Sequence, residues 1–317
     1  MADPFEAEND DEWSQWFAAL HDGHKEKVIK AVTDQINKLH RAANITHIRH
    51  RFFSESRKLT ELDLGSCTAF AALPESLGQL QALTRLDLDD CRSLMALPES
   101  LGQLRALTKL NLDGCDSLMA LPESLGQLRA LTTLDLDGCD SLMALPESLG
   151  QLQALTTLYM GGCTSLAALP ESFGQLQALT TLYLWSCTSL MALPESLGQL
   201  LALTELHLGG CSSLMALPES LGQLQALTRL NLTNCTSLMA LPESLGQLQA
   251  LTTLNLYECT SLADESKDLA RRLEQCNKKI RDGPTGSPER FFMTTYDFAA
   301  TILYGSSSRY GAGAAAS

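Results

Sequence analysis

The stretch LPESLGQLQALTRLDLDDCRSLMA, residues 73–96, decides the fold because it recurs every 24 residues without an insertion. Further copies begin at Leu97, Leu121, Leu145, Leu169, Leu193, Leu217 and Leu241. A fixed period of this length is typical of solenoids, in which each repeat forms one coil of a continuous stack. A single coil does not bury its own apolar side chains, so we expect the repeats to share one core.

Each repeat is predicted to contain one strand. In the copy from Leu83, Leu86 and Leu88 alternate with polar residues, as in a strand with one buried face. Pro98 and Gly102 favour a return path that turns instead of extending. The inward-facing set continues around the coil with Cys91, Leu94, Leu97, Leu101 and Leu104. We therefore expect an α/β solenoid with a parallel sheet on its concave side.

The composition limits the class and the location of the protein. The chain has 317 residues, 45% of them apolar, and a formal net charge of −14. No stretch reaches the roughly 18 apolar residues of a membrane-spanning helix. The acidic N-terminus lacks the basic and apolar regions of a secretory signal. We expect one elongated, cytoplasmic domain with no membrane partner.

Nine of the ten cysteines, from Cys67 to Cys259, occupy one repeat position. Stacked strands lie about 4.8 Å apart, a spacing that does not exclude disulfides. The side chains run parallel into the core, however, and nine is an odd number. We interpret them as a ladder of buried thiols with weak hydrogen bonds to the turn backbone, which favours a reducing compartment. A zinc site is disfavoured because the chain has no C-x-x-C pair.

The string L-x-x-L-x-L-x-x-C-x-S-L-x-x-L-P-x-S-L-G-x-L resembles the leucine-rich repeats of plant intracellular disease-resistance receptors and of the related Ras-group leucine-rich-repeat proteins. The resemblance covers residues 59–262, close to two-thirds of the chain. It implies a right-handed leucine-rich repeat solenoid, or horseshoe, that recognises proteins in signalling or immunity. The chain lacks the phosphate-binding loop G-x-x-x-x-G-K-S/T, and with it the nucleotide switch of those receptors. It also lacks the L-x-G-x-I-P of secreted plant receptors.

The flanks of the repeats are interpreted as helical caps. We expect an N-terminal helical cap, nine repeats, a C-terminal capping helix, and a final linker, aromatic segment and disordered tail, at residues 1–58, 59–262, 263–283 and 284–317. One face of the capping helix carries Leu269, Leu273, Cys276 and Ile280. Capping is favoured over a separate binding role because terminal coils need their core covered. The aromatic segment 291–304 is expected to dock on the C-terminal cap or to serve as a peptide that a partner recognises.

The outward strand positions vary between repeats, whereas the convex positions do not. The position of Asp87 holds, in chain order, Asp63, Asp87, Asn111, Asp135, Tyr159, Tyr183, His207, Asn231 and Asn255. The position of Asp89 holds Gly65, Asp89, Asp113, Asp137, Gly161, Trp185, Gly209, Thr233 and Tyr257. Convex Glu75, Ser76 and Gln79 recur in nearly every copy, although packing is not expected to require one residue type there. This concentration of changes favours a binding site on the concave face.

Acidic residues gather on the first four repeats. Residues 59–262 contain 20 acidic and 6 basic side chains, which accounts for the whole net charge. Such a surface attracts a partner with a basic patch and repels nucleic acid. Solubility is one alternative, although it does not call for clustering at one end of one face. Calcium is another, but the D-x-D-x-D-G loop is missing. The acidic candidates are Asp87, Asp89, Asp113, Asp135 and Asp137.

Aromatic side chains follow the acids along the same face. Tyr159, Tyr183 and Trp185 fall in the middle of the arc with His207 beside them, and Tyr257 lies near the end. Exposed aromatics also occur in strands merely for their β-propensity. Their central position favours anchors of an interface, because binding energy concentrates in central Tyr, Trp and Arg residues.

No motif indicates catalysis, a cofactor or a metal. G-x-S-x-G and H-E-x-x-H are missing, and the best interpretation of His21, His24, His47 and His50 is surface histidines. We predict a non-catalytic module that binds a protein or peptide partner on its concave face, in intracellular signalling or defence. The alternatives are the sensor part of a larger multidomain NTPase or enzyme complex, and a consensus-engineered stack.

Overall fold

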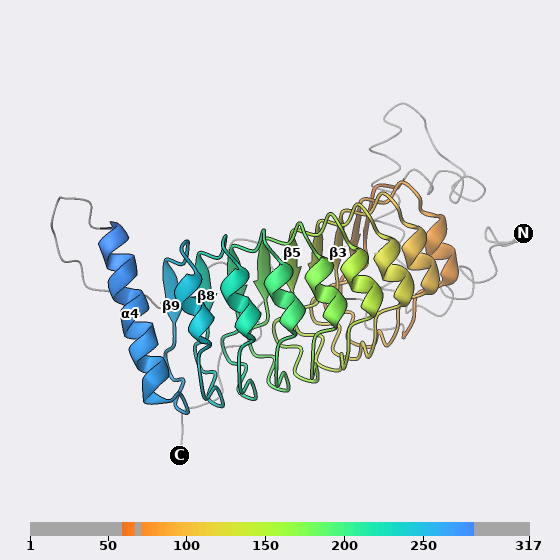
Figure 1. Cartoon of the computed structure of the whole chain (residues 1–317). Coiled ribbons are helices and arrows are strands. Elements are labelled where there is room, and N and C mark those ends of the chain that lie inside the picture. The colour runs from red at the N-terminus through yellow and green to blue at the C-terminus, as the bar shows by residue number, and fades with distance from the viewer. Residues whose placement is uncertain (1–58, 67–70, 282–317) are drawn as a thin grey trace, which may run out of the picture. The chain divides into compact units, whose positions relative to one another are not determined.

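The computed structural model describes residues 59–66 and 71–281, which form one sheet of nine parallel strands (Figure 1). Each strand pairs with the next one in the chain, so that Leu62 lies opposite Leu86 and Leu86 opposite Leu110. The strands are β1 (Glu61–Asp63), β2 (Arg85–Asp87), β3 (Lys109–Asn111), β4 (Thr133–Asp135), β5 (Thr157–Tyr159), β6 (Thr181–Tyr183), β7 (Glu205–His207), β8 (Arg229–Asn231) and β9 (Thr253–Asn255). The predicted solenoid is confirmed.

The leucines expected to point inward form one continuous core. Leu86, Leu88 and Cys91 are fully buried, and so are the same positions of the following repeats as far as the eighth. Full burial of one such side chain stabilises the fold by about 1.5–3 kcal/mol. In the fifth repeat Met160 and Phe173 replace two of the leucines and are also fully buried. The core therefore tolerates changes of shape but stays apolar.

The return path of each coil contains a short 3-10 helix, and these helices lie on one side of the sheet (Figure 1). In the second of them Pro98 has a φ of −71° and stands at the N-cap. The backbone N–H of Leu101 donates to the carbonyl of Pro98 at 3.0 Å, which is the i to i+3 pattern. The helices are η1 (Glu75–Gln79), η2 (Glu99–Gln103), η3 (Glu123–Gln127), η4 (Glu147–Gln151), η5 (Glu171–Gln175), η6 (Glu195–Gln199), η7 (Glu219–Gln223) and η8 (Glu243–Gln247).

Two ladders of side-chain hydrogen bonds join neighbouring coils. The hydroxyl of Thr132 donates to the carbonyl of Thr108 at 3.0 Å, and this bond recurs from Thr84 to Thr252. The thiol of Cys115 donates to the carbonyl of Leu88 at 3.3 Å, and equivalent bonds recur at every 24th residue from Cys91 to Cys259. These eight cysteines are free and buried, as predicted. Cys67 and the side chain of Cys276 lie outside the described part of the chain.

Contacts between coils also constrain the recurring convex residues. The carboxylate of Glu75 accepts the backbone N–H of Ser100 at 2.9 Å, and the same bond repeats along the helices to Ser220. A Cβ added to Gly102 would lie 2.4 Å from the carbonyl oxygen of Ser124. The expectation that packing requires no particular residue here is therefore wrong. Negative charge at a helix N-terminus is favourable, and small residues let adjacent helices approach.

After β9 the chain forms α4 (Asp264–Arg281) in place of a ninth 3-10 helix, and α4 lies beside the last coil (Figure 1). Leu269 and Leu273, two of the residues expected on its apolar side, are buried in the core. The hydroxyl of Ser266 accepts the backbone N–H of Leu241 at 2.9 Å. The helix thus covers the end of the stack. The predicted N-terminal cap and residues 284–317 lie outside the described residues, so the domain division stays a prediction.

Candidate functional site

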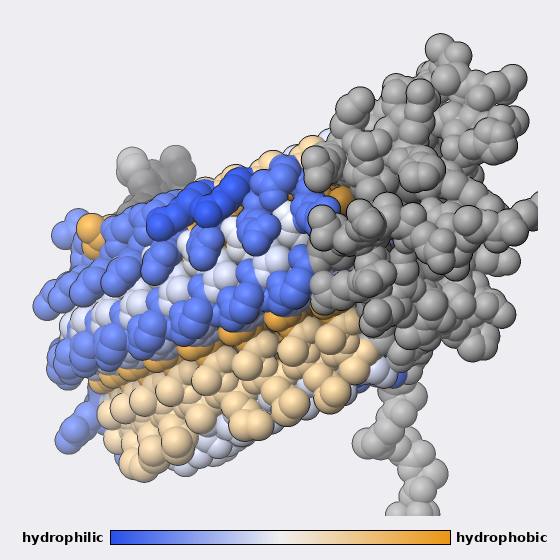
Figure 2. Space-filling view, turned by 90° about the vertical axis from the view of Figure 1, so that its right-hand side faces the viewer, coloured by the Kyte–Doolittle hydropathy of each residue, from blue (hydrophilic) through white to orange (hydrophobic). Residues whose placement is uncertain are grey.

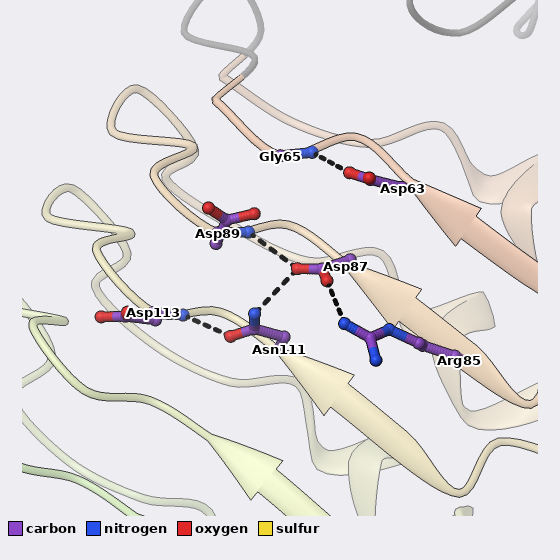
Figure 3. Close-up of polar contacts among 7 residues, drawn as sticks. All are labelled: Asp63, Gly65, Arg85, Asp87, Asp89, Asn111 and Asp113. Atoms are coloured by element: carbon purple, nitrogen blue, oxygen red, sulfur yellow. Dashed lines mark hydrogen bonds and ion pairs between the residues drawn. The ribbon is translucent and has the colours of Figure 1, made fainter. Parts of the chain in front are cut away.

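The last residue of each strand organises the turn that follows it. In six of the nine repeats this residue is Asp or Asn, and its side-chain oxygen accepts the backbone N–H two residues further on. Figure 3 shows this bond in the first three repeats. The six pairs are Asp63 with Gly65, Asp87 with Asp89, Asn111 with Asp113, Asp135 with Asp137, Asn231 with Thr233 and Asn255 with Tyr257. The turn therefore restricts which residues occupy this position in those six repeats.

Three consecutive repeats replace this Asp or Asn by a ring. The hydroxyls of Tyr159 and Tyr183 lie too far from Cβ to accept the same N–H, and His207 takes part in ring stacking and in a contact of its Nε2 with Glu205. Instead the rings of Tyr159 and Tyr183 stack with centroids 5.0 Å apart and planes 3° apart. The ring of His207 stacks on Tyr183 with centroids 4.6 Å apart. We call this set the aromatic column, and each stacked pair of this kind contributes about 0.5–1.5 kcal/mol.

Trp185 flanks the aromatic column and is 39% exposed. A Cβ added to Gly161 would lie 2.0 Å from its Nε1, so the indole lies directly over that glycine. The backbone N–H of Gly161 donates to Asp137 at 2.6 Å, and the Trp185 side chain also hydrogen-bonds to Asp137. Gly161 is not among the site residues predicted from the sequence. The available signal was that it lies 24 residues before Trp185, at the same position of the preceding repeat.

His207 and Tyr257 differ in burial and in their distance along the chain from Trp185. His207 is buried to 9% exposure, and its Nε2 lies 3.3 Å from a carboxylate oxygen of Glu205. Tyr257 is exposed but lies three repeats beyond Trp185, and a hydrogen bond to Glu258 raises its pKa. Tyr257 is therefore separate from the aromatic column.

Asp87 is enclosed by its neighbours (Figure 3). Its Oδ2 accepts Arg85 at 2.7 Å and its Oδ1 accepts the amide of Asn111 at 2.8 Å. The residue is 8% exposed. Both oxygens of its carboxylate accept hydrogen bonds from neighbouring side chains. Asp87 therefore positions the residues around it and does not present its charge to solvent.

The remaining candidate carboxylates are half-buried and repel one another. Burial, with the charge of Asp87, raises the pKa of Asp89 to about 6. Burial raises the pKa of Asp135 to about 7 and that of Asp113 above its ordinary value. The pKa of Asp137 is raised well above its usual range by burial and by the charge of Asp135. We call Asp89, Asp113, Asp135 and Asp137 the carboxylate row. A cationic partner would relieve both the repulsion and the raised pKa values.

In the described part of the chain no three His, Cys, Asp or Glu side chains are grouped so that they could hold a metal ion. Among the same residues, no helix is long and apolar enough to cross a bilayer.

Comparison with known families identifies the class. The family described as "Leucine-rich repeat region" matches residues 115–209 and 163–282, which together span more than half of the chain. The protein belongs to the leucine-rich repeat family, whose domains are commonly protein-interaction modules. Curated protein sequences gave no significant match.

One solved structure supports the fold, and two others are less similar. The leucine-rich repeat domain of the type III effector XopL is 25% identical with a TM-score of 0.59, and the match covers 79% of this chain and 87% of that one. A leucine-rich repeat protein of Leptospira interrogans is 22% identical with a TM-score of 0.27, covering 73% and 92% of the two chains. The Arabidopsis receptor kinase HAESA, in complex with the peptide hormone IDA, is 21% identical with a TM-score of 0.38, covering 77% and 52%.

Proposed function

We propose that the protein is a non-catalytic recognition module that binds a protein or peptide on its sheet face. The aromatic column carries this proposal. Three adjacent repeats replace the turn-forming Asp or Asn by rings that stack on one another, next to a partly exposed tryptophan. Departures from a local structural rule, without a gain to the turn itself, are typical of functional sites. Central Tyr and Trp side chains are typical anchors of protein interfaces.

The carboxylate row supports a partner with a basic segment. Solubility alone does not account for carboxylates that are half-buried beside one another, because their raised pKa values mean that ionisation costs folding energy. Lys or Arg side chains arriving from a partner would offset this cost. The aromatic column would then bind the apolar part of the same segment. We place this recognition in the cytoplasm, in signalling or defence, and the eight free buried thiols support a reducing compartment.

Alanine substitution tests the site. We expect the double variant Tyr183→Ala, Trp185→Ala to bind a partner captured from native lysate at least about tenfold more weakly, mainly through faster dissociation. Asp89→Asn, Asp113→Asn and Asp137→Asn together should slow association and weaken its salt dependence. The matched control changes exposed Gln151, Gln175 and Gln199 on the helix side to Ala. If the control variant lost the partner while both sheet-face variants kept it, the sheet-face site would be wrong.

A further inference from the structure

A second exposed surface lies on the flank of the stack, away from the strands. Six methionines at one repeat position are each 45–60% exposed, and an exposed alanine follows each of them. We call this surface the methionine band; its methionines are Met95, Met119, Met143, Met191, Met215 and Met239. Figure 2 shows a continuous hydrophobic band along the stack beside a row of hydrophilic residues. An exposed apolar surface that is continuous, rather than scattered, marks an interaction site.

Hydrogen bonds between neighbouring coils order the backbone beneath the methionine band. The N–H of Met215 donates to the carbonyl of Met191 at 3.1 Å, and that of Met239 donates to Met215 at 3.1 Å. Ala216 and Ala240 form a parallel bridge next to them. The leucines on either side, such as Leu214 and Leu217, are buried. Flexible methionine tips are thus carried on an ordered backbone, which suits a surface that adapts to a partner's side chains.

One edge of the band carries negative charge. Three residues after each methionine–alanine pair the chain has a glutamate, and Glu75 and Glu171, which follow Ala–Ala pairs, complete a row that runs from Glu75 to Glu243. In each of the first eight repeats the segment that corresponds to residues 94–100 contains no Lys or Arg. At the C-terminal end of the row, Arg272 lies 3.9 Å from Glu243. The glutamates keep one edge of the band acidic, whereas Ser and Thr predominate on the other edge.

Charge and spacing select the occupant. A second copy of the chain would bring a second glutamate row and a net charge of −14 against the first. An α-helix rises about 5.4 Å per turn, close to the roughly 4.8 Å between stacked strands. Over four successive turns the two spacings diverge by only about 2 Å. In an extended peptide, side chains on one face recur about every 6.6 Å, which matches less well.

We propose that the methionine band docks an amphipathic α-helix of a partner, with the helix axis along the stack, its apolar face on the methionines and its basic edge on the glutamate row. This site is distinct from the sheet face, so either proposal can fail without the other.

A synthetic helix tests the proposal. The probe is a peptide of roughly 18 residues with Leu on one helical face and Lys on the other. Its controls are a scrambled peptide of equal composition and an analogue with Glu in place of Lys. We expect the full chain to bind the patterned peptide at least about tenfold more tightly than either control. Changing Met119, Met143, Met191 and Met215 to Gln should reduce that affinity at least about tenfold, because glutamine keeps the length of the side chain but not its apolar character.

Two matched variants locate the effect. Leu201 is 60% exposed on the helix side, so Leu201→Gln removes one side chain as exposed as the methionines from another surface and should leave binding unchanged. Glu123→Gln, Glu147→Gln and Glu171→Gln keep an acceptor for the serine N–H, and they should weaken binding and its salt dependence. Equal urea midpoints would show that all of the variants fold. The sheet-face variant Asp89→Asn, Asp113→Asn, Asp137→Asn should bind the peptide normally.

Four outcomes would overturn the proposal. These are absence of peptide binding, equal binding of the scrambled peptide, undiminished binding by the methionine variant, and loss of binding only in the sheet-face variant. Sedimentation that reveals a dimer dissociated by the methionine substitutions would replace the helix by a second copy. Binding to neutral phosphatidylcholine vesicles that these substitutions abolish would replace it by a lipid surface.

Discussion

The helix side and the sheet face of the stack use repetition in opposite ways. On the helix side every copy repeats the same contact, from a glutamate carboxylate to the serine N–H of the next coil. On the sheet face six repeats share a turn-forming Asp or Asn, while three adjacent repeats depart from it. The recurring residues of the helix side are therefore kept by contacts between coils. Their lack of variation does not show how fast an unconstrained position would change, so it cannot serve as a reference for the variable positions of the sheet face.

Function on the sheet face is indicated by features that cost folding free energy, and not by variation between repeats alone. Burial and mutual repulsion oppose ionisation of the carboxylate row, and the aromatic column lacks the turn bond of its neighbours. The carboxylate row thus places groups on the sheet face whose ionisation opposes stability, whereas the recurring glutamates of the helix side bond neighbouring coils together. The serine hydroxyls are an exception on the helix side, because from Ser100 to Ser244 the described ones are buried without a hydrogen-bond partner. Their small size and backbone N–H, not their hydroxyl, serve the stacking.

The largest expected effect is on the helix side. Gly126→Ala places a Cβ 2.3 Å from the carbonyl oxygen of Ser148, so the coils must separate. We expect a loss of about 1–3 kcal/mol of unfolding free energy, measured by urea denaturation. Gly246→Ala is the matched control, because a Cβ at the same position of the last repeat meets nothing within 4 Å. Equal losses in the two variants would show that stacking contacts do not explain the recurring glycine.

The next effect separates folding from binding on the sheet face. Tyr183→Asn restores the residue that forms the turn in other repeats. The gain of a hydrogen bond worth about 0.5–1.5 kcal/mol only partly offsets the loss of two stacked pairs, together about 1–3 kcal/mol, so the unfolding free energy should fall by about 1 kcal/mol in urea denaturation. Affinity for the partner should fall at least about tenfold, as measured by calorimetry. A variant that binds normally would remove the aromatic column from the site.

The carboxylate row predicts a pH dependence of stability. The folded pKa of Asp135, about 7, exceeds the roughly 3.9 of a free aspartate, so the folded state binds protons more tightly than the unfolded state. This contribution is fully present below pH ~4 and is lost as the pH rises through about 7. We expect a higher melting temperature at pH ~5 than at pH ~8, by about 2 °C or more.

Two substitutions sharpen that result. Asp135→Asn with Asp137→Asn should flatten the pH dependence and stabilise the protein at pH ~8. Asn retains the oxygen that accepts the turn N–H, as Asn111 and Asn231 show. Conversely, Asn111→Asp adds a carboxylate beside Asp87 and should steepen the dependence. A melting temperature that rose from pH ~5 to pH ~8 in the unaltered protein would contradict the assignment.

The smallest expected effect concerns the ladder of threonine hydroxyls that joins neighbouring coils. Thr132→Val removes the hydroxyl that donates to Thr108 while keeping the shape of the side chain. We expect a loss of about 0.5–1.5 kcal/mol in urea denaturation. Thr133→Val, one residue later at the start of β4, should cost less. A larger loss of unfolding free energy for Thr133→Val than for Thr132→Val would contradict a stabilising role for the Thr132 hydroxyl.

The sequence by itself determined the coil, its period and its core. Leucines at strand alternation have to face inward, and a repeat of 24 residues without insertions brings equivalent positions into register. The burial of the cysteines and the place of α4 followed from the same pattern. The sequence also located the acidic end and the aromatic middle of the sheet face, because both are read directly from two outward positions.

Only the tertiary structure decided which atoms meet between coils. Asp87 belonged to the candidate set by its position, yet Arg85 and Asn111 enclose it. Trp185 covers Gly161, and Glu75 binds the N–H of Ser100, 25 residues later. These contacts depend on how far successive coils are offset and on which rotamer each side chain adopts. The sequence specifies the order of the coils, but it specifies neither their offset nor the rotamer of each side chain.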